Sequence, residues 1–435
     1  IAPADRTCPE PGAKASRGVA KGQGLPGGCT ADLVHRFYQE QYQFNGGRMD
    51  RYVTGSDVTG LAMGHYDTTR LPLYRYLHEP NHPAYVIADN FFQAAFGGSY
   101  LNHQWLIAAA TPVYFDALGD GSQGDLHTLL DTQGMPAEYP LYRPTGPVKE
   151  GPLTVKCPAP IAGLACGDYA INTIQPFAQP YAPKTPEAKR LPPQTNRTIG
   201  ESLTDAGIDW AWYSGGWSNA NGDVDGPGWT NGRGPACSDP QAHPDAVFPN
   251  CPGRLFQYHH QPLNFYSAYA PGTPARREHL RDEQEFIEGI LAPGGECGLK
   301  SVSFVKPYGV DNEHPGYASE HQGQDHALHL IRAVMEGPCA KDTLLILTYD
   351  EFGGQWDHVS PPGQGGIPGP HDSWGPGTRI PALILAPFLA GQQAVDRVQH
   401  DTTSILATLE HRYGLPPLGS RDAAVADLST IFTAH

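Results

Sequence analysis

A buried strand that ends in two adjacent acidic residues constrains this chain more than any other feature. Within Thr343–Pro362, the apolar run Leu344–Leu347 predicts a fully buried strand. Asp350 and Glu351 follow it, and a Gly-Gly pair at 353–354 then allows a sharp turn. In an open α/β sheet, ligands bind beyond the carboxyl ends of strands, so this position suits two oxygen ligands for a cation. An isolated Asp-Glu pair is more often a solvated acidic turn, so the assignment depends on the rest of the sequence.

Other apolar runs alternate with helical stretches along the chain. We predict short strands at 84–89, 300–306 and 378–387 and helices at 31–53, 277–291, 325–335 and 402–413. This alternation predicts an α/β fold with a largely parallel sheet. Since no internal repeat or linker is visible, we expect one domain over residues 1–435, with long loop insertions at about 113–200 and 218–253.

The balance of charge restricts the ligands that the chain can bind. Its net charge is −16 at pH 7, whereas a protein that binds duplex nucleic acid needs a basic face, so we expect no nucleic-acid partner. An anionic substrate would have to be attracted by a local positive site, such as a bound metal ion.

Cysteine usage indicates an oxidising compartment. The eight cysteines form no C-x-x-C motif, and several lie in loops rich in Gly and Pro. From proximity in sequence we predict disulfides 8–29, 157–166, 237–251 and 297–339, and hence a secreted or periplasmic protein. No apolar run reaches transmembrane length.

Ser99 follows the predicted strand at 84–89 and a Gly-Gly pair at 97–98. Two glycines inside a helix would cost about 2 kcal/mol, so we predict a turn with Ser99 at the N-cap of the next helix. There the helix dipole would favour a serine alkoxide and a bound phosphoryl oxygen. Asn102 and His103, one turn later, can donate hydrogen bonds to an anion. A plain capping serine is the commoner role, so this assignment also depends on its neighbours.

Histidines lie in comparable places elsewhere. His314 comes just after the predicted strand at 300–306, His259 and His260 follow an aromatic segment, and His358 lies in the loop beyond the acidic pair. A single loop histidine is usually only exposed. Several of them near two carboxylates suggest general-acid catalysis or binding of an anionic oxygen.

The acidic pair and the serine also suit a metal ion. Asp350, Glu351 and the Ser99 oxygen could hold one divalent cation that polarises an ester and lowers the pKa of the serine hydroxyl. Oxygen ligands fit Ca²⁺, Mg²⁺ or Mn²⁺, and a histidine would admit Zn²⁺.

Seven segments of the chain can be compared together with known families. They read FNGGRMDRYV, LAMGHYD, IADNFFQAAFGGSYLNHQWLI, FQYHHQP, SFVKPYGVDNEHPGY, TYDEFGGQWDHVSPP and WGPGTRIPALILAP. As a set, they closely resemble the acid phosphatase A and bacterial phospholipase C superfamily of phosphoesterases, from about residue 30 to about residue 425. The resemblance implies an alkaline-phosphatase-like fold, a three-layer sandwich around a central, largely parallel sheet. The form GGSYLNH is more similar to the acid phosphatase branch than to the phospholipase branch.

The resemblance also implies a role for each matching residue. Ser99 would be the nucleophile that becomes phosphorylated, and Asp350 and Glu351 would be metal ligands. The side chains that would contact the phosphate or the leaving group are His35, His260, His314 and Asn102. Further substrate contacts are expected from His259, His103 and His358.

One family motif has no counterpart in this sequence. The family opens with a strand followed by Glu-Asn-x-Ser-Phe-Asp, whose Glu and Asn complete the metal site, and no such segment is present. We expect either that this segment is a separate, cleaved chain bound as a partner or that it has been lost. The intact set of other motifs favours the first alternative.

Three functions follow from these observations. The first is a metal-dependent acid phosphatase that hydrolyses small phosphomonoesters through a phosphoserine intermediate. The second is a phospholipase C that acts on phosphodiesters, with an apolar groove near the site. The third is an inactive, secreted binding protein that lacks part of the metal site.

Overall fold

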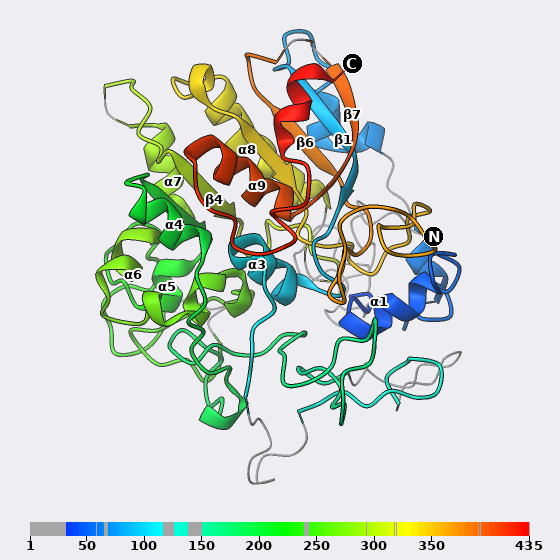
Figure 1. Ribbon diagram of the computed structural model, residues 1–435. Helices are drawn as coiled ribbons and strands as arrows, with labels where there is room; N and C mark the ends of the chain where they lie inside the picture. The colour runs from blue at the N-terminus through cyan, green and yellow to red at the C-terminus, as the bar shows by residue number, and fades with distance from the viewer. Residues whose placement is uncertain are drawn as a thin grey trace.

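The computed structural model describes residues 32–57, 59–64, 68–115, 126–137, 150–238, 243–292, 294–316, 318, 320–389, 391 and 393–434 (Figure 1). Within these ranges the strands are β1 Tyr85–Phe92, β2 Trp210–Ser214, β3 Leu280–Asp282, β4 Val302–Lys306, β5 Leu345–Thr348, β6 Ala382–Leu385 and β7 Gln393–Asp401. They form a four-stranded sheet in the order β5-β6-β1-β7 and a three-stranded sheet in the order β3-β2-β4.

Helices separate most of the strands. The α-helices of the described ranges are α1 Phe37–Phe44, α2 Pro72–Tyr76, α3 Ser99–Ala108, α4 Ile199–Asp205, α5 Trp217–Asn221, α6 Pro274–His279, α7 Glu283–Ile290, α8 Glu320–Met335 and α9 Thr403–Tyr413. The 3₁₀-helices are η1 Thr59–Met63, η2 Thr68–Arg70, η3 Glu187–Lys189, η4 Tyr258–His260, η5 Pro262–Phe265, η6 Ser267–Tyr269, η7 Ala340–Asp342 and η8 Leu428–Thr433. Among the described residues, no helix combines the length and the apolar character that crossing a bilayer requires.

The predicted α/β class is confirmed by the strand pairing. β2 is parallel to both β3 and β4, and β1 is parallel to β7. β6 is antiparallel to both β1 and β5, so β1 and β5 run in the same direction. Their carboxyl ends therefore lie at the same edge of the sheet, where ligand sites of α/β proteins are found.

Helices cover both faces of the four-stranded sheet and make the three layers that the resemblance implies. Because successive side chains of a strand point to opposite faces, Tyr85 and Val86 of β1 enter different clusters. Tyr85 packs with Ile331 of α8 on one face. Val86 belongs to the large core cluster, which also contains Leu101 of α3 and Leu406 of α9. Figure 1 shows α3 and α9 close together.

Some local predictions are wrong. The helix predicted at 277–291 is divided into α6, β3 and α7, because β3 pairs with β2 and the Asp282 side chain caps α7 by accepting the N–H of Gln284. The helix predicted at 31–53 is confined to α1, which ends at Asn45 in the left-handed conformation. The N-cap of α3 is Gly98, and Ser99 is its first helical residue. Strand β7 was not predicted, since its sequence QAVDRVQHD is mostly polar.

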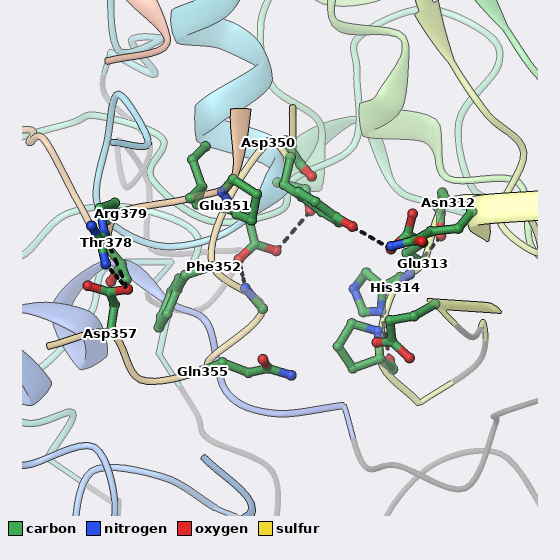
Figure 2. A pocket seen from close by; sticks show the side chains of 18 of the residues that line it. Asn312, Glu313, His314, Asp350, Glu351, Phe352, Gln355, Asp357, Thr378 and Arg379 are labelled. Atoms are coloured by element: carbon green, nitrogen blue, oxygen red, sulfur yellow. Dashed lines mark hydrogen bonds and ion pairs between the residues drawn. The ribbon is translucent and has the colours of Figure 1, made fainter. Parts of the chain in front are cut away.

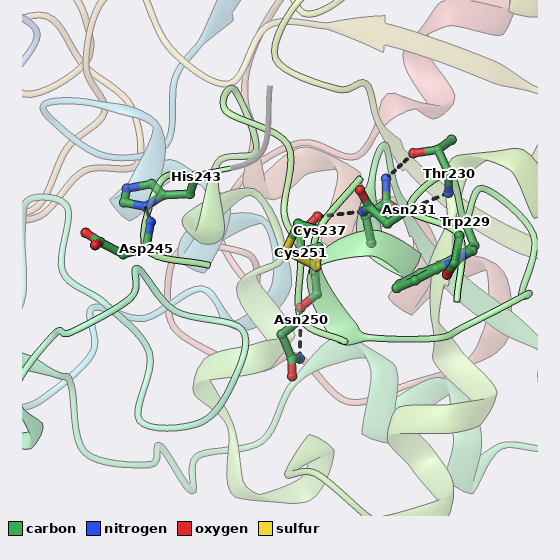
Figure 3. Close-up of a disulfide and its surroundings, with 11 residues drawn as sticks. Trp229, Thr230, Asn231, Cys237, His243, Asp245, Asn250 and Cys251 are labelled. Carbon is green, nitrogen blue, oxygen red and sulfur yellow. Dashed lines mark hydrogen bonds between the residues drawn. A yellow bond between two sulfur atoms is a disulfide. The ribbon is translucent and has the colours of Figure 1, made fainter. Parts of the chain in front are cut away.

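Two of the predicted disulfides are present, 237–251 and 297–339, with Cα–Cα distances of 5.5 and 4.7 Å. Around the first, Asn231 Nδ2 donates a 2.9 Å hydrogen bond to the Cys251 carbonyl (Figure 3). The predicted pair 157–166 is wrong: both cysteines are free thiols, which contact each other through a side-chain hydrogen bond and not through a covalent bond. The predicted pair 8–29 lies outside the described residues.

Two buried carboxyl groups join α9 to the segment that follows it. Glu410 and Asp422 are each 2% exposed, and both accept the N–H of Leu418, at 3.3 and 2.7 Å. Burial and the neighbouring Asp422 carboxyl raise the pKa of Glu410 from 4.5 to about 8. The folded state therefore retains a proton that the unfolded chain releases near pH 4.5. Stability from this proton is present below about pH 4.5 and is lost as the pH rises through about 8.

We expect Glu410→Gln, which cannot ionise, to gain stability relative to the wild type as the pH rises from about 5 to about 9. Urea unfolding midpoints of both proteins at the two pH values measure this gain. Glu288→Gln, at an exposed position of α7, is the matched control and should show none. A difference between Glu410→Gln and the wild type that is the same at both pH values would contradict the prediction.

Candidate active site

A cavity of about 250 Å³ lies at the carboxyl ends of β4 and β5. The polar residues that line it include Ser99, His260, Lys306, His314, Asp350 and Glu351. Figure 2 shows Asp350 and Glu351 in the middle, with His314 on one side and Arg379 on the other. The structure therefore brings the predicted serine and the predicted acidic pair together.

The turn before α3 requires glycine at two positions. Gly97 has a φ of 89°, which strains residues with a side chain. A Cβ on Gly98 would lie 2.7 Å from Cδ2 of His35, so the His35 ring packs against the backbone just before Ser99. Ser99 is 5% exposed, and its Oγ lies 3.5 Å from Oε1 of Glu351. The serine hydroxyl is thus fixed at the start of α3, facing the acidic pair.

Glu40 of α1 anchors this turn. Its Oε2 accepts the N–H of Gly97 at 2.5 Å, and its Oε1 accepts the N–H and the hydroxyl of Thr378 at 2.8 and 2.7 Å. Gln93 donates to Glu40 Oε2 at 3.1 Å and accepts the N–H of Phe352 at 2.9 Å. These bonds connect α1, the residue after β1, the serine turn and the loop after the acidic pair.

The two acidic residues lie in different electrostatic environments. Asp350 Oδ1 is 3.4 Å from Lys306 Nζ, and its Oδ2 is 3.5 Å from His103 Nδ1. Burial opposes ionisation of Asp350, but Lys306 and His103 outweigh it and hold the pKa of this carboxyl well below its usual range. Burial raises the pKa of Glu351 to about 7; His35 partly offsets it and the Asp350 charge adds to it. Asp350 is therefore ionised at neutral pH, whereas Glu351 gains or loses its proton close to pH 7.

Two pairs of histidines flank the acidic pair. The rings of His35 and His314 meet edge to face, with centroids 5.4 Å apart. The rings of His103 and His260 stack, with centroids 5.0 Å apart. His35 Nε2 lies 3.9 Å from Glu351 Oε1, so the first pair is beside Glu351 and the second is beside Asp350.

The histidines also differ in their pKa values. Burial lowers the pKa of His35, but the Glu351 and Asp32 carboxylates outweigh it and raise this pKa above 6.5. Burial and Lys306 lower the pKa of His103 to about 4, and burial lowers the pKa of His314. His35 is therefore the ring best suited to hold a proton that a leaving group can take.

Donor atoms for a metal ion gather in two separate groups around the acidic pair. In two groups the donor atoms all lie within 4.8 Å of one another: Asp32 with His35 and His314, and Asp350 with His103 and His260. In the second group, Asp350 Oδ2 and His260 Nε2 are buried and have no hydrogen-bond partner among the residues that the structure describes. A buried polar atom without a partner costs about 1–3 kcal/mol, and a bound cation would satisfy both atoms. The residues present therefore fit a divalent ion.

The other predicted site residues lie around this centre. His259 packs edge to face against His260, with ring centroids 4.6 Å apart. Asn102 is 1% exposed, and its amide is bonded to the backbone of the serine turn, including the Ala95 N–H at 2.9 Å and the Gly98 carbonyl at 3.2 Å. His358 is exposed beside Trp356 and does not line the described cavity.

Three residues of the site were not predicted. Lys306 is the last residue of β4, and its position at the end of a predicted strand was a usable signal. Glu40 and Gln93 carried no such signal, because a polar residue within a helix or after a strand is usually exposed.

A buried serine, two carboxylates and flanking histidines at the carboxyl edge of an α/β sheet define the class of metal-assisted phosphoesterase sites. Comparison of sequences agrees with this class. The Phosphoesterase family matches the chain over residues 16–416, and the chain belongs to that family.

Curated relatives in this family are named as phospholipases. Phospholipase C A of Mycobacterium tuberculosis (strain ATCC 25618 / H37Rv) is 27% identical over 447 residues, which cover 95% of this chain and 66% of the relative. Phospholipase C B of the same strain is 33% identical over 161 residues, or 31% of this chain and 29% of the relative. Non-specific phospholipase C6 of Arabidopsis thaliana is 28% identical over 159 residues, or 31% and 30%.

The matched part of the chain spans at most 66% of the length of these three relatives. Their names do not single out the acid phosphatase branch, and the comparisons give no support to a separately cleaved first segment.

Proposed function

We propose that this protein is a metal-dependent phosphoric ester hydrolase that uses Ser99 as its nucleophile and forms a phosphoserine intermediate. The observation that carries the proposal is the approach of the Ser99 hydroxyl to Glu351, 3.5 Å away, in a cavity that Asp350 also lines. Membership in the Phosphoesterase family supports it.

The residues of the chain account for both steps of the reaction. The Ser99 oxygen attacks phosphorus as its proton passes to Glu351, and the bond to the leaving oxygen breaks as that oxygen takes a proton from His35. Water then attacks the phosphoserine as one of its protons passes to His35, the bond between phosphorus and the serine oxygen breaks, and Glu351 returns the proton to Ser99. A divalent ion held by Asp350 with His103 and His260, when bound, would polarise the phosphoryl oxygens and lower the pKa of the serine hydroxyl, which leaves Glu351 free to take its proton.

We propose a phosphomonoesterase of the acid phosphatase type as the first candidate. A phospholipase C is the second candidate, and two observations favour it. The three relatives described above are all named phospholipase C. The lining of the cavity also includes the apolar side chains of Leu71, Phe352 and Trp356, and Trp356 is 38% exposed. Assays of p-nitrophenyl phosphate against phosphatidylcholine vesicles distinguish the two. Faster turnover of the lipid would replace the first candidate by the second.

Removal of divalent ions should lower hydrolysis at least about 100-fold, because the buried Asp350 Oδ2 would lose its cation. Treatment with a chelator followed by addition of Mg²⁺, Mn²⁺, Ca²⁺ or Zn²⁺ separately measures the loss and identifies the ion that restores turnover. Elemental analysis of the untreated protein should find about one ion per chain. Full activity in protein shown to be metal-free would contradict the metal assignment, and absence of both metal and turnover would support an inactive binding protein.

The two disulfides support a secreted or periplasmic location, since such bonds persist in oxidising compartments.

A further inference from the structure

The side chain of Lys306 reaches the site from the end of β4. The backbone of Lys306 is fixed by pairing with Ser214 of β2 and by the Gly215 N–H, which donates to its carbonyl at 3.0 Å. The side chain is 16% exposed and lines the cavity together with Ser99 and Asp350. Strand pairing therefore fixes the backbone from which this side chain reaches the cavity.

The cavity contains two cationic side chains of Lys or Arg type in the part of the chain that the structure describes, and they differ in how they are neutralised. Arg379 lies between two carboxylates, with Nη2 3.1 Å from Asp357 and Nη1 3.4 Å from Asp89. Lys306 has one carboxylate neighbour within 4 Å among the described residues, Asp350, at 3.4 Å. That distance is longer than a good N–H···O hydrogen bond, so the three N–H donors of the ammonium group are not consumed by Asp350.

The surroundings of Ser99 are negatively charged, so a phosphoester bound there needs a positive charge close by. The protein carries a net charge of −16, so its overall field opposes the approach of a phosphate group. Two carboxylates, Asp350 and Glu351, lie beside the serine oxygen and add to that opposition. An ammonium group within the cavity offsets this repulsion at short range, where a low local dielectric strengthens it.

We propose that Lys306 is a phosphate-binding residue, whose ammonium group donates to a non-bridging oxygen of the phosphoryl group at Ser99. The inference rests on the proposed function for the identity of the substrate, but binding of inorganic phosphate tests it without turnover. Lys306 touches the substrate through a charged hydrogen bond that persists as negative charge develops on the phosphoryl oxygens.

Three variants of the full chain test the assignment. Lys306→Met should weaken inorganic phosphate binding in calorimetry about 10-fold to 100-fold and lower kcat/KM by about 100-fold to 1,000-fold, with a rise in KM and a fall in kcat. Lys306→Arg keeps the charge and should stay within about tenfold of the wild type. Lys300→Met is the matched control, since Lys300 also has an aspartate partner, 3.8 Å away at Asp209, but does not line the cavity. It should leave both measurements unchanged.

A measurement on the wild-type protein covers the case in which Lys306→Met does not fold. Acetylation of lysines, followed by mass spectrometry, should be slowed by inorganic phosphate at Lys306 and not at Lys300. Equal labelling of Lys306 with and without phosphate, or wild-type phosphate affinity in folded Lys306→Met, would overturn the assignment.

These results can be separated from a failure of the proposed function. If the wild type hydrolyses phosphoesters and Lys306→Met does so at the same rate, the phosphate-binding role of Lys306 is wrong, but the proposed activity stands. If the wild type hydrolyses nothing but binds phosphate through Lys306, the binding role remains and the proposed activity is wrong.

Discussion

Ser99→Ala should lower kcat for phosphoester hydrolysis at least about 10⁴-fold, because the variant has no oxygen to attack phosphorus. The fold should remain intact. Ser99 is the first helical residue and not the N-cap of α3, and its contact with Glu351 is long, at 3.5 Å. Loss of this contact should therefore change the free energy of unfolding by less than about 1 kcal/mol. Turnover of p-nitrophenyl phosphate and urea unfolding measure the two effects.

The control for this variant is Ser267→Ala, in η6 and outside the cavity, which should keep wild-type activity. A second measurement addresses the intermediate itself. Acid quenching of the wild type during turnover, followed by peptide mass spectrometry, should find phosphate on Ser99. Undiminished turnover by Ser99→Ala, or phosphate trapped on another residue, would contradict the assignment of the nucleophile.

The parts of the fold that the sequence predicts are those where a single physical rule dominates. The apolar run in 343–362 becomes β5, but the prediction that this strand is fully buried is wrong: β5 is an edge strand of its sheet, and its four residues are half-buried. The strand at 300–306 becomes β4, in which Val302 is buried and the other residues are half-buried. Strand β7 was not predicted because most of its residues are polar. Its formation depends on pairing with β1, which lies far away in the sequence.

The candidate site shows the same division. Ser99, Asp350 and Glu351 were predictable because each follows a strand, where polar residues next to glycines serve few structural purposes. Their convergence, with Ser99 Oγ 3.5 Å from Glu351, depends on β1 and β5 running in the same direction, which no local pattern encodes. The role of Asn102 illustrates the limit. Its residue type suits an anion, but its amide is bonded to the backbone of the turn.

Glu40→Ala should be the most destabilising of the substitutions considered, since Glu40 connects segments that are remote in sequence. The side chain is fully buried and accepts hydrogen bonds from Gly97, from Gln93 and, twice, from Thr378. Its removal leaves the backbone N–H groups of Gly97 and Thr378 without their acceptor, whereas Gln93 and the Thr378 hydroxyl keep other partners. Because each buried donor without a partner costs about 1–3 kcal/mol, we expect a loss of about 2–6 kcal/mol in the free energy of unfolding. Glu278→Ala, on an exposed part of α6, should change it by less than about 0.5 kcal/mol.

The same variant tests how the serine is positioned. Gly97 would lose the bond that fixes the turn before Ser99, and a displacement of about 1 Å at a reacting atom can cost about 100-fold in rate. Measured under conditions where Glu40→Ala is folded, kcat should therefore fall about 100-fold while the dissociation constant for inorganic phosphate stays within about tenfold, since Lys306 and its strand are not attached to Glu40.

Thr378→Val, which removes one of the four donors, should reproduce a fraction of the loss in stability and, combined with Glu40→Ala, should add less than its single effect. Additive effects of the two substitutions, or a stable Glu40→Ala variant with wild-type kcat, would show that the serine turn is held by other contacts.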